Sequence, residues 1–137
     1  MSDLEINNPG ANADVVAAVK RYEGALVGND VEALDRAFWD SPHTVRFGAG
    51  ENLYGRDEIL TFRKARSSKA LARSVNRLVV TTFGNDFATA SLEFVRKGEP
   101  RVGRQSQTWV RFPEGWRVVG AHVSWMDQTP PNDLGHV

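Results

Sequence analysis

The order of two kinds of pattern along the chain is the feature that most restricts its fold. Apolar residues recur at helical spacing before about residue 65, whereas the chain after Arg73 is rich in Val and Thr and alternates with a period of two. Helices that come first and strands that come second are typical of an α+β domain. We therefore predict three helices packed on a strongly bent antiparallel sheet of four to five strands, with a ligand-sized hollow between them.

Turn and capping residues separate the predicted elements. Residues 1–10 are expected to form a flexible arm and residues 127–137 a mobile tail, which leaves one domain over residues 11–126. The helices are expected at about 13–27 (capped by Asn12), 31–38 (capped by Asp30) and 57–65, and the strands at about 43–47, 73–83, 87–96, 102–112 and 116–125.

Composition excludes several classes of function. The absence of cysteine excludes disulfides, thiolate metal sites and cysteine nucleophiles, and 17 basic against 17 acidic residues give no general attraction to nucleic acid or to a membrane. His43, His122 and His136 are scattered, so we expect neither a metal nor an organic cofactor. The N-terminus shows no secretory signal, and no apolar run approaches a membrane span, so we expect a cytoplasmic protein.

Two residues occupy positions that suggest chemistry. Tyr22 lies in the apolar stripe of the first helix, where it is either a core tyrosine with one hydrogen bond or a hydroxyl aimed into the hollow as a donor. Arg46 alternates with Val45 and Phe47 in a short strand. It is either exposed to solvent or directed into a pocket, and a pocket arginine implies an anionic ligand such as a carboxylate.

The strand at 102–112 is unusually polar. Its residues Gln105, Gln107 and Trp109 share one face, which suits a small ligand with amide and carboxylate groups, or alternatively a hydrophilic subunit contact. His122 is a weaker candidate for proton transfer than Tyr22 or Arg46. The basic stretch from Arg63 to Arg77 is interpreted as a solvated helix end and loop rather than as an anion site.

Three stretches, Arg21 to Gly55, Thr81 to Phe94 and Gly103 to Ser124, resemble the AtzH-like family of the NTF2-like (cystatin-like) superfamily of cone-shaped α+β folds. The resemblance implies a decarboxylating amidohydrolase that converts 1,3-dicarboxyurea to allophanate in cyanuric acid (s-triazine) catabolism. It implies Tyr22 and Arg46 as the catalytic pair. Arg46 then grips a carboxylate, Tyr22 donates a proton or orients water, Gln107 binds the urea and Trp109 walls the planar ligand.

Other functions stay open at this point. A second branch of the family accompanies oxalurate catabolism in purine breakdown, so a non-catalytic partner or ligand-binding module is one alternative. An isomerase or cyclase acting on a hydrophobic ring is another, but it needs an acidic base, and Glu93 alternates away from the apolar residues beside it. We also expect a homo-oligomer, at least a dimer, formed through the outer sheet face with the apolar residues Trp116, Val118, Val119 and Trp125.

Overall fold

The structure is a computed structural model, and it describes residues 4–67 and 71–127. The predicted tail, with His136, therefore lies almost entirely outside the described residues. None of the described helices combines the length and the apolar character that crossing a membrane requires. The described elements are α1 (Pro9–Val27), α2 (Val31–Ala37), β1 (Val45–Phe47), β2 (Asn52–Tyr54), α3 (Arg56–Ala65), β3 (Ser74–Phe83), β4 (Phe87–Val95), β5 (Val102–Phe112) and β6 (Gly115–Met126).

Helix α1 begins earlier than predicted because Asn8, and not Asn12, caps it. The Asn8 side-chain oxygen accepts hydrogen bonds from the backbone N–H groups of Gly10 and Ala11, at 3.0 and 3.1 Å. Pro9 fits the first helical turn, where a missing N–H costs nothing. Ile6 pairs with Phe83 of β3. The prediction of a flexible arm over residues 1–10 is therefore wrong for its described part, residues 4–10, which joins the sheet and starts the helix.

The strands form one mixed sheet in the order β2-β1-β6-β5-β4-β3. The α+β class is confirmed, but the prediction of an entirely antiparallel sheet of four to five strands is wrong. Six described strands are present, and β1 runs parallel to β6. The parallel pair arises because the chain leaves the β1–β2 hairpin, crosses to the far edge and returns to β1 only with its last described strand. Strand β2 is too short to give an alternating pattern in the sequence.

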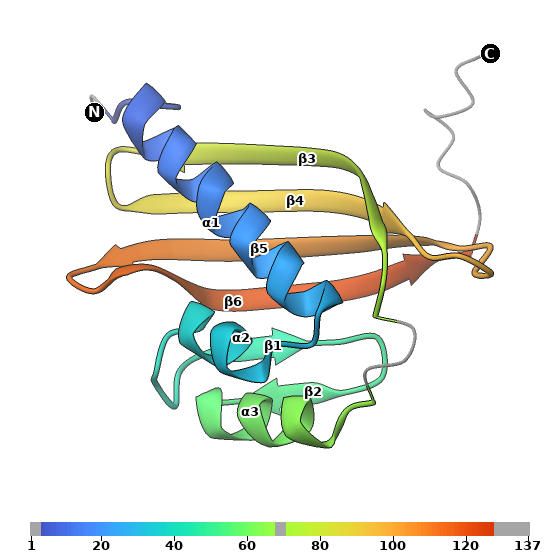
Figure 1. The fold of residues 1–137 in the computed structure, drawn as a ribbon. Coiled ribbons are helices and arrows are strands. Elements are labelled where there is room, and N and C mark those ends of the chain that lie inside the picture. The colour runs from blue at the N-terminus through green and yellow to red at the C-terminus, as the bar shows by residue number, and fades with distance from the viewer. Residues whose placement is uncertain (1–3, 68–70, 128–137) are drawn as a thin grey trace, which may run out of the picture.

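The described helices cover one face of the sheet. Figure 1 shows α1 running diagonally across the strands, with α2 and α3 beside the short strands β1 and β2. The core lies between α1 and the sheet, where Val15 and Val19 meet Leu92 and Phe94. Loss of water contact by these apolar side chains supplies the main stabilisation of the fold.

A β-bulge in β6 determines which residues face the core. Thr108 pairs with Gly120 and Trp109 with Val118, which leaves Val119 as the extra residue. The alternation therefore changes phase at the bulge, and the apolar residues on both sides of it pack inward. The prediction that four apolar residues of β6 form a contact on the outer sheet face is thus wrong for three of them. The residues that lie in or against the core are Trp116, Val118 and Trp125.

Candidate active site

Tyr22 lies on the buried face of α1 and reaches toward α3. Only 4% of the residue is exposed, and its ring packs against Phe38 with 5.9 Å between centroids. The hydroxyl oxygen accepts a hydrogen bond of 3.0 Å from Nη2 of Arg63. Because a guanidinium can only donate, this contact leaves the hydroxyl hydrogen for another acceptor. The geometry therefore suits Tyr22 to act as a proton or hydrogen-bond donor.

The surroundings of Tyr22 make its hydroxyl more acidic than that of an ordinary tyrosine. Burial by itself raises the pKa of Tyr22. The positive charges of Arg63, Arg46 and Arg73, together with the hydrogen bond from Arg63, outweigh burial and lower the pKa below its usual value. Arg46 is thus close enough to act on Tyr22, so the fold brings the two predicted catalytic residues into one electrostatic environment.

Arg46 occupies the centre of β1, which is paired with β2 on one side and β6 on the other. It is 7% exposed, so the solvent interpretation is wrong and the guanidinium is directed into the protein. Its Nη1 donates to Oε2 of Glu51 at 2.9 Å, from the turn between β1 and β2. Gly48 makes this contact possible, because a Cβ at that position would lie 1.6 Å from the same Glu51 oxygen. The local sequence therefore holds Arg46 in place through one of its nitrogens.

The floor of the site is a row of residues in register across the sheet. Gln107 of β5 pairs with Ala121 of β6, and Ala121 pairs with Arg46 of β1. Two strand spacings, about 10 Å in total, separate the backbones that carry Gln107 and Arg46. The residue between them has only a methyl side chain. The sheet thus carries an amide and a guanidinium on either side of one small side chain.

One face of β5 is buried, so the alternative of an exposed hydrophilic contact is wrong for it, whereas Arg104 and Ser106 on the other face are exposed. Gln105, Gln107 and Trp109 are 4%, 2% and 1% exposed. The Gln107 Oε1 accepts from Trp109 Nε1 at 3.0 Å, and the Gln105 Oε1 accepts from Arg73 Nη2 at 3.0 Å. Since both partners are donors only, each amide oxygen is committed. The buried Nε2 groups of the two glutamines have no partner among the described residues and can donate to a ligand.

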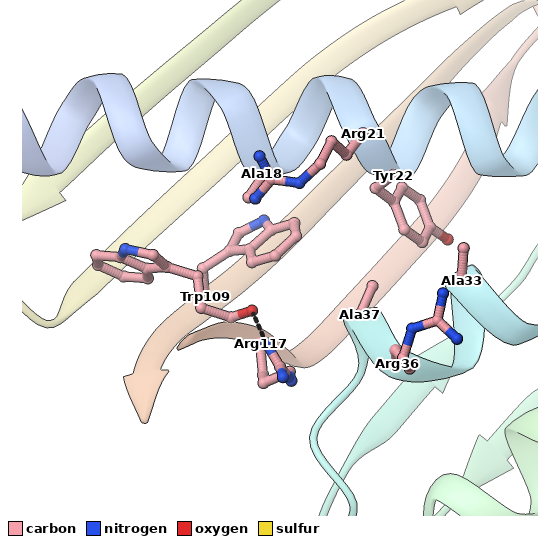
Figure 2. Close-up of a pocket in the computed structure, with 9 residues that line it drawn as sticks. Ala18, Arg21, Tyr22, Ala33, Arg36, Ala37, Trp109 and Arg117 are labelled. Atoms are coloured by element: carbon pink, nitrogen blue, oxygen red, sulfur yellow. Dashed lines mark hydrogen bonds between the residues drawn. The ribbon is translucent and has the colours of Figure 1, made fainter. Parts of the chain in front are cut away.

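A cavity of about 270 Å³ opens beside Tyr22. Figure 2 shows its walls coming from α1, α2, β5 and β6, with Tyr22 and Trp109 both lining it. Arg46 and Gln107 are not among its lining residues. Trp109 connects this cavity to the row of Gln107, Ala121 and Arg46 through its bond to Gln107, and Tyr22 connects it to Arg63. The cavity is also cationic, because its lining includes Arg21, Arg36 and Arg117.

Sequence reasoning missed the arginines of α3. Arg63 is 1% exposed, which contradicts its interpretation as part of a solvated helix end. Arg73, from the same basic stretch, is also buried and pairs with Glu23, its Nη2 lying 2.5 Å from Oε2. A signal was present, because Arg63 follows the buried Ile59 by four residues and so shares its helix face. His122, in contrast, is exposed and packs on Phe47, away from the buried cluster.

The sequence profile of the AtzH-like family matches residues 4–129. The chain belongs to the AtzH-like family. A protein with unknown function from the DUF3225 family of Pectobacterium atrosepticum is 56% identical to this AtzH-like chain, and its crystal structure gives a TM-score of 0.88 over 89% of this chain and 95% of that one. A cystatin-like fold protein from Burkholderia xenovorans is 46% identical, with a TM-score of 0.88 over 93% and 99% of the two chains.

More distant structures share the fold of this AtzH-like protein. An NTF2-like superfamily protein from Salmonella enterica is 20% identical, with a TM-score of 0.72 over 90% of this chain and 96% of that one. At that identity the likeness concerns architecture alone, and it agrees with the expected NTF2-like, cystatin-like fold. Comparison with curated proteins gave no match.

Proposed function

We propose that this AtzH-like protein is a small hydrolase that converts 1,3-dicarboxyurea to allophanate (urea-1-carboxylate) with release of carbon dioxide. The observation that carries the proposal is a set of buried hydrogen-bond donors that have no acceptor among the described residues. These donors include the amide groups of Gln105 and Gln107 and guanidinium nitrogens of Arg63. Buried donors without acceptors are costly, and a small planar anion rich in carboxylate and carbonyl oxygens satisfies them.

The polar row supplies the binding contacts of the proposed substrate. Arg46 commits Nη1 to Glu51, which leaves a second nitrogen to hold one N-carboxylate. Gln107 donates its amide N–H to the urea carbonyl, and the Trp109 ring forms a flat wall. The ligand then lies over Ala121, whose methyl group is the only side chain of the row between Gln107 and Arg46. The cationic cavity beside Tyr22 provides the approach for an anion.

Tyr22 supplies the proton in the proposed reaction. The bond between a carboxylate carbon and a urea nitrogen breaks, its electron pair stays on the nitrogen, and the nitrogen takes the proton of Tyr22. The carbon leaves as carbon dioxide, and the phenolate regains a proton from water, so that dianion plus proton gives the allophanate monoanion and carbon dioxide. Arg63 stabilises the transient phenolate through its hydrogen bond to the Tyr22 oxygen. The step needs neither a metal nor an organic cofactor.

The test is carbon dioxide release from freshly generated 1,3-dicarboxyurea, compared with the uncatalysed rate. We expect the wild type to accelerate the release and Tyr22→Phe to lower the turnover number by about a hundredfold or more. Tyr54→Phe is the matched control, because Tyr54 is 55% exposed, and it should keep full activity. Arg46→Lys keeps the charge but loses the planar fork, so its KM should rise.

Two outcomes contradict this proposal. Full activity of Tyr22→Phe would reduce the hydroxyl to a core hydrogen-bonding group. A wild type that binds the substrate but does not accelerate its decay would favour the alternative, a non-catalytic ligand-binding partner in an amidohydrolase pathway. Substitution of Ala121 by Leu adds an independent check, because it fills the proposed ligand position without removing any polar group and should abolish binding.

A homo-oligomer of at least two chains is a separate part of the proposal. The sheet face opposite the described helices carries Val79 and Phe87, which are 48% and 42% exposed. Association through this face would remove both side chains from water. Light scattering at micromolar concentration should give the mass of two or more chains, and the mass of a single chain would contradict the expectation.

A further inference from the structure

Arg63 and Arg66, at the end of α3, carry charges that no carboxylate of the described residues pairs with. The other arginines near Tyr22 are neutralised: Arg46 pairs with Glu51 at 2.9 Å, and Arg73 pairs with Glu23. Arg63 bonds only to the neutral hydroxyl of Tyr22 in the described structure. The neighbourhood of Tyr22 thus holds an excess of two positive charges over its paired carboxylates.

Several hydrogen-bond donors of these two guanidinium groups are buried. Nε and Nη1 of Arg63, and Nε and Nη2 of Arg66, are buried without a partner among the described residues. The Arg63 guanidinium lies over aromatic rings, 4.9 Å from the Phe38 centroid and 5.6 Å from that of Tyr22. Arg66 lies 5.5 Å from the Phe62 centroid, and Arg46 lies at the same distance from that ring. Arg46 and Arg66 therefore share one aromatic neighbour, and Arg63 lies over the ring of Tyr22.

We propose that Arg63 and Arg66 form a second carboxylate-binding subsite beside Arg46, so that the site selects small dianions over monoanions. The inference rests on the proposed function, since it assigns the second carboxylate of that substrate. Two adjacent cations with unused donors match one carboxylate better than any neutral group. The reaction removes one carboxylate, so the product keeps only one of the two charged contacts. Selection for dianions thus also promotes product release.

The electrostatics around Arg66 agree with this assignment. Burial, followed by the charges of Arg63 and Arg46, lowers the pKa of Arg66 to about 10. Arg66 is therefore still charged at neutral pH, but it lies in surroundings that disfavour its charge. A bound carboxylate reverses that penalty, because an opposite charge within a few ångströms favours the ionised guanidinium.

The experiment measures binding of two unreactive probes by calorimetry. Glutarate is a dianion with the same number of chain atoms as 1,3-dicarboxyurea, and its monoamide is a monoanion of the same shape. We expect the wild type to bind glutarate at least about tenfold more tightly than the monoamide, as befits one additional charge-assisted contact. Arg66→Gln should reduce this ratio to about threefold or less. Arg66→Lys should restore part of it, because the charge is retained.

Lys64→Gln is the matched control, because it removes the same charge from an exposed position of the same helix. It should keep the wild-type ratio. A wild type without preference for glutarate, or an Arg66→Gln variant that keeps the preference, overturns the inference. Turnover of 1,3-dicarboxyurea is measured separately. Dianion preference without turnover overturns the proposed function alone, whereas turnover without dianion preference overturns this inference alone.

Discussion

Replacement of Arg66 by Met should stabilise the protein in the absence of ligand. Arg66 follows the last residue of α3, its Nε and Nη2 are buried without a partner in the described structure, and its guanidinium lies 5.5 Å from the Phe62 centroid. Methionine has nearly the same reach and keeps an apolar contact with that ring, but it carries no charge. The substitution therefore separates the cost of the charge from the packing of the side chain.

The size of the effect follows from the pKa of Arg66, which burial and the charges of Arg63 and Arg46 lower to about 10. A shift of this size corresponds to a free energy of roughly 3 kcal/mol by which the folded surroundings disfavour the charged guanidinium. Because the residue is only half-buried and solvent screens part of the interaction, about 1 kcal/mol is the appropriate expectation. The free energy of unfolding of Arg66→Met should therefore exceed that of the wild type by about 1 kcal/mol.

The pH dependence has a definite sign. The folded-state pKa of this base is lower than its unfolded-state pKa, so the unfolded chain holds the proton more strongly. The loss of folding stability caused by the charged Arg66 is then fully present below about pH 10 and disappears as the pH rises above that value. Between about pH 6 and 9 the difference between Arg66→Met and the wild type should stay constant.

Urea unfolding followed by tryptophan fluorescence is the appropriate assay, in chloride buffer free of carboxylates, phosphate and sulfate. Lys64→Met, at an exposed position of the same helix, should change the free energy of unfolding by less than about 0.5 kcal/mol. A loss of about 1 kcal/mol or more in Arg66→Met would refute the reasoning, because the charge would then contribute stability. With saturating glutarate the wild type should have the higher free energy of unfolding of the two, since only the wild type is stabilised by bound ligand.

Three further predictions test other parts of the structure. Gly103→Ala should lower the free energy of unfolding by about 1–3 kcal/mol in urea titrations, because its Cβ would lie 2.2 Å from a ring atom of the buried Phe94. Asn8→Ala should lower it by about 1 kcal/mol in the same assay through loss of the α1 cap. The side-chain hydrogen bonds from Arg101, followed by the bond from its backbone N–H, lower the pKa of Glu99 to about 2. An NMR titration should therefore place the Glu99 midpoint near 2, and Arg101→Ala should raise it toward the usual value of about 4.3 without reaching it, because the backbone N–H of residue 101 remains.

Local patterns predicted the parts of the site that depend on one element at a time. The helical stripe placed Tyr22 on the buried side of α1, and alternation placed Arg46 opposite Val45 and Phe47. The same alternation put Gln107 and Trp109 on one face of β5, where both are buried. These assignments succeed because side-chain direction follows from backbone geometry within a helix or strand.

The remaining features depend on segments that are distant in sequence. Burial of Arg63 requires Tyr22 of α1 and Phe38, which directly follows α2; the spacing from Ile59 indicates the helix face of Arg63 but not these partners. The parallel pairing of β1 with β6 depends on how the whole chain crosses the sheet. The bulge at Val119 changes the phase of β6, so Trp116, Val118 and Trp125, which we predicted on the outer face, all pack inward. Pairing partners and register are tertiary properties, and a single sequence carries them only weakly.

The parallel pairing of β1 with β6 also sets the order in which the site can assemble during synthesis. The ribosome makes Tyr22 and Arg46 early, but Ala121, which lies between Arg46 and Gln107, belongs to the last described strand. Until that strand emerges, β1 has a neighbour on one side only, and the arginines of α3 remain hydrated in a nascent chain that has not closed. A chain arrested before β6 therefore exposes the unpaired edge of β1 and lacks the strand that links Arg46 to Gln107, which makes it a target for chaperones and proteases.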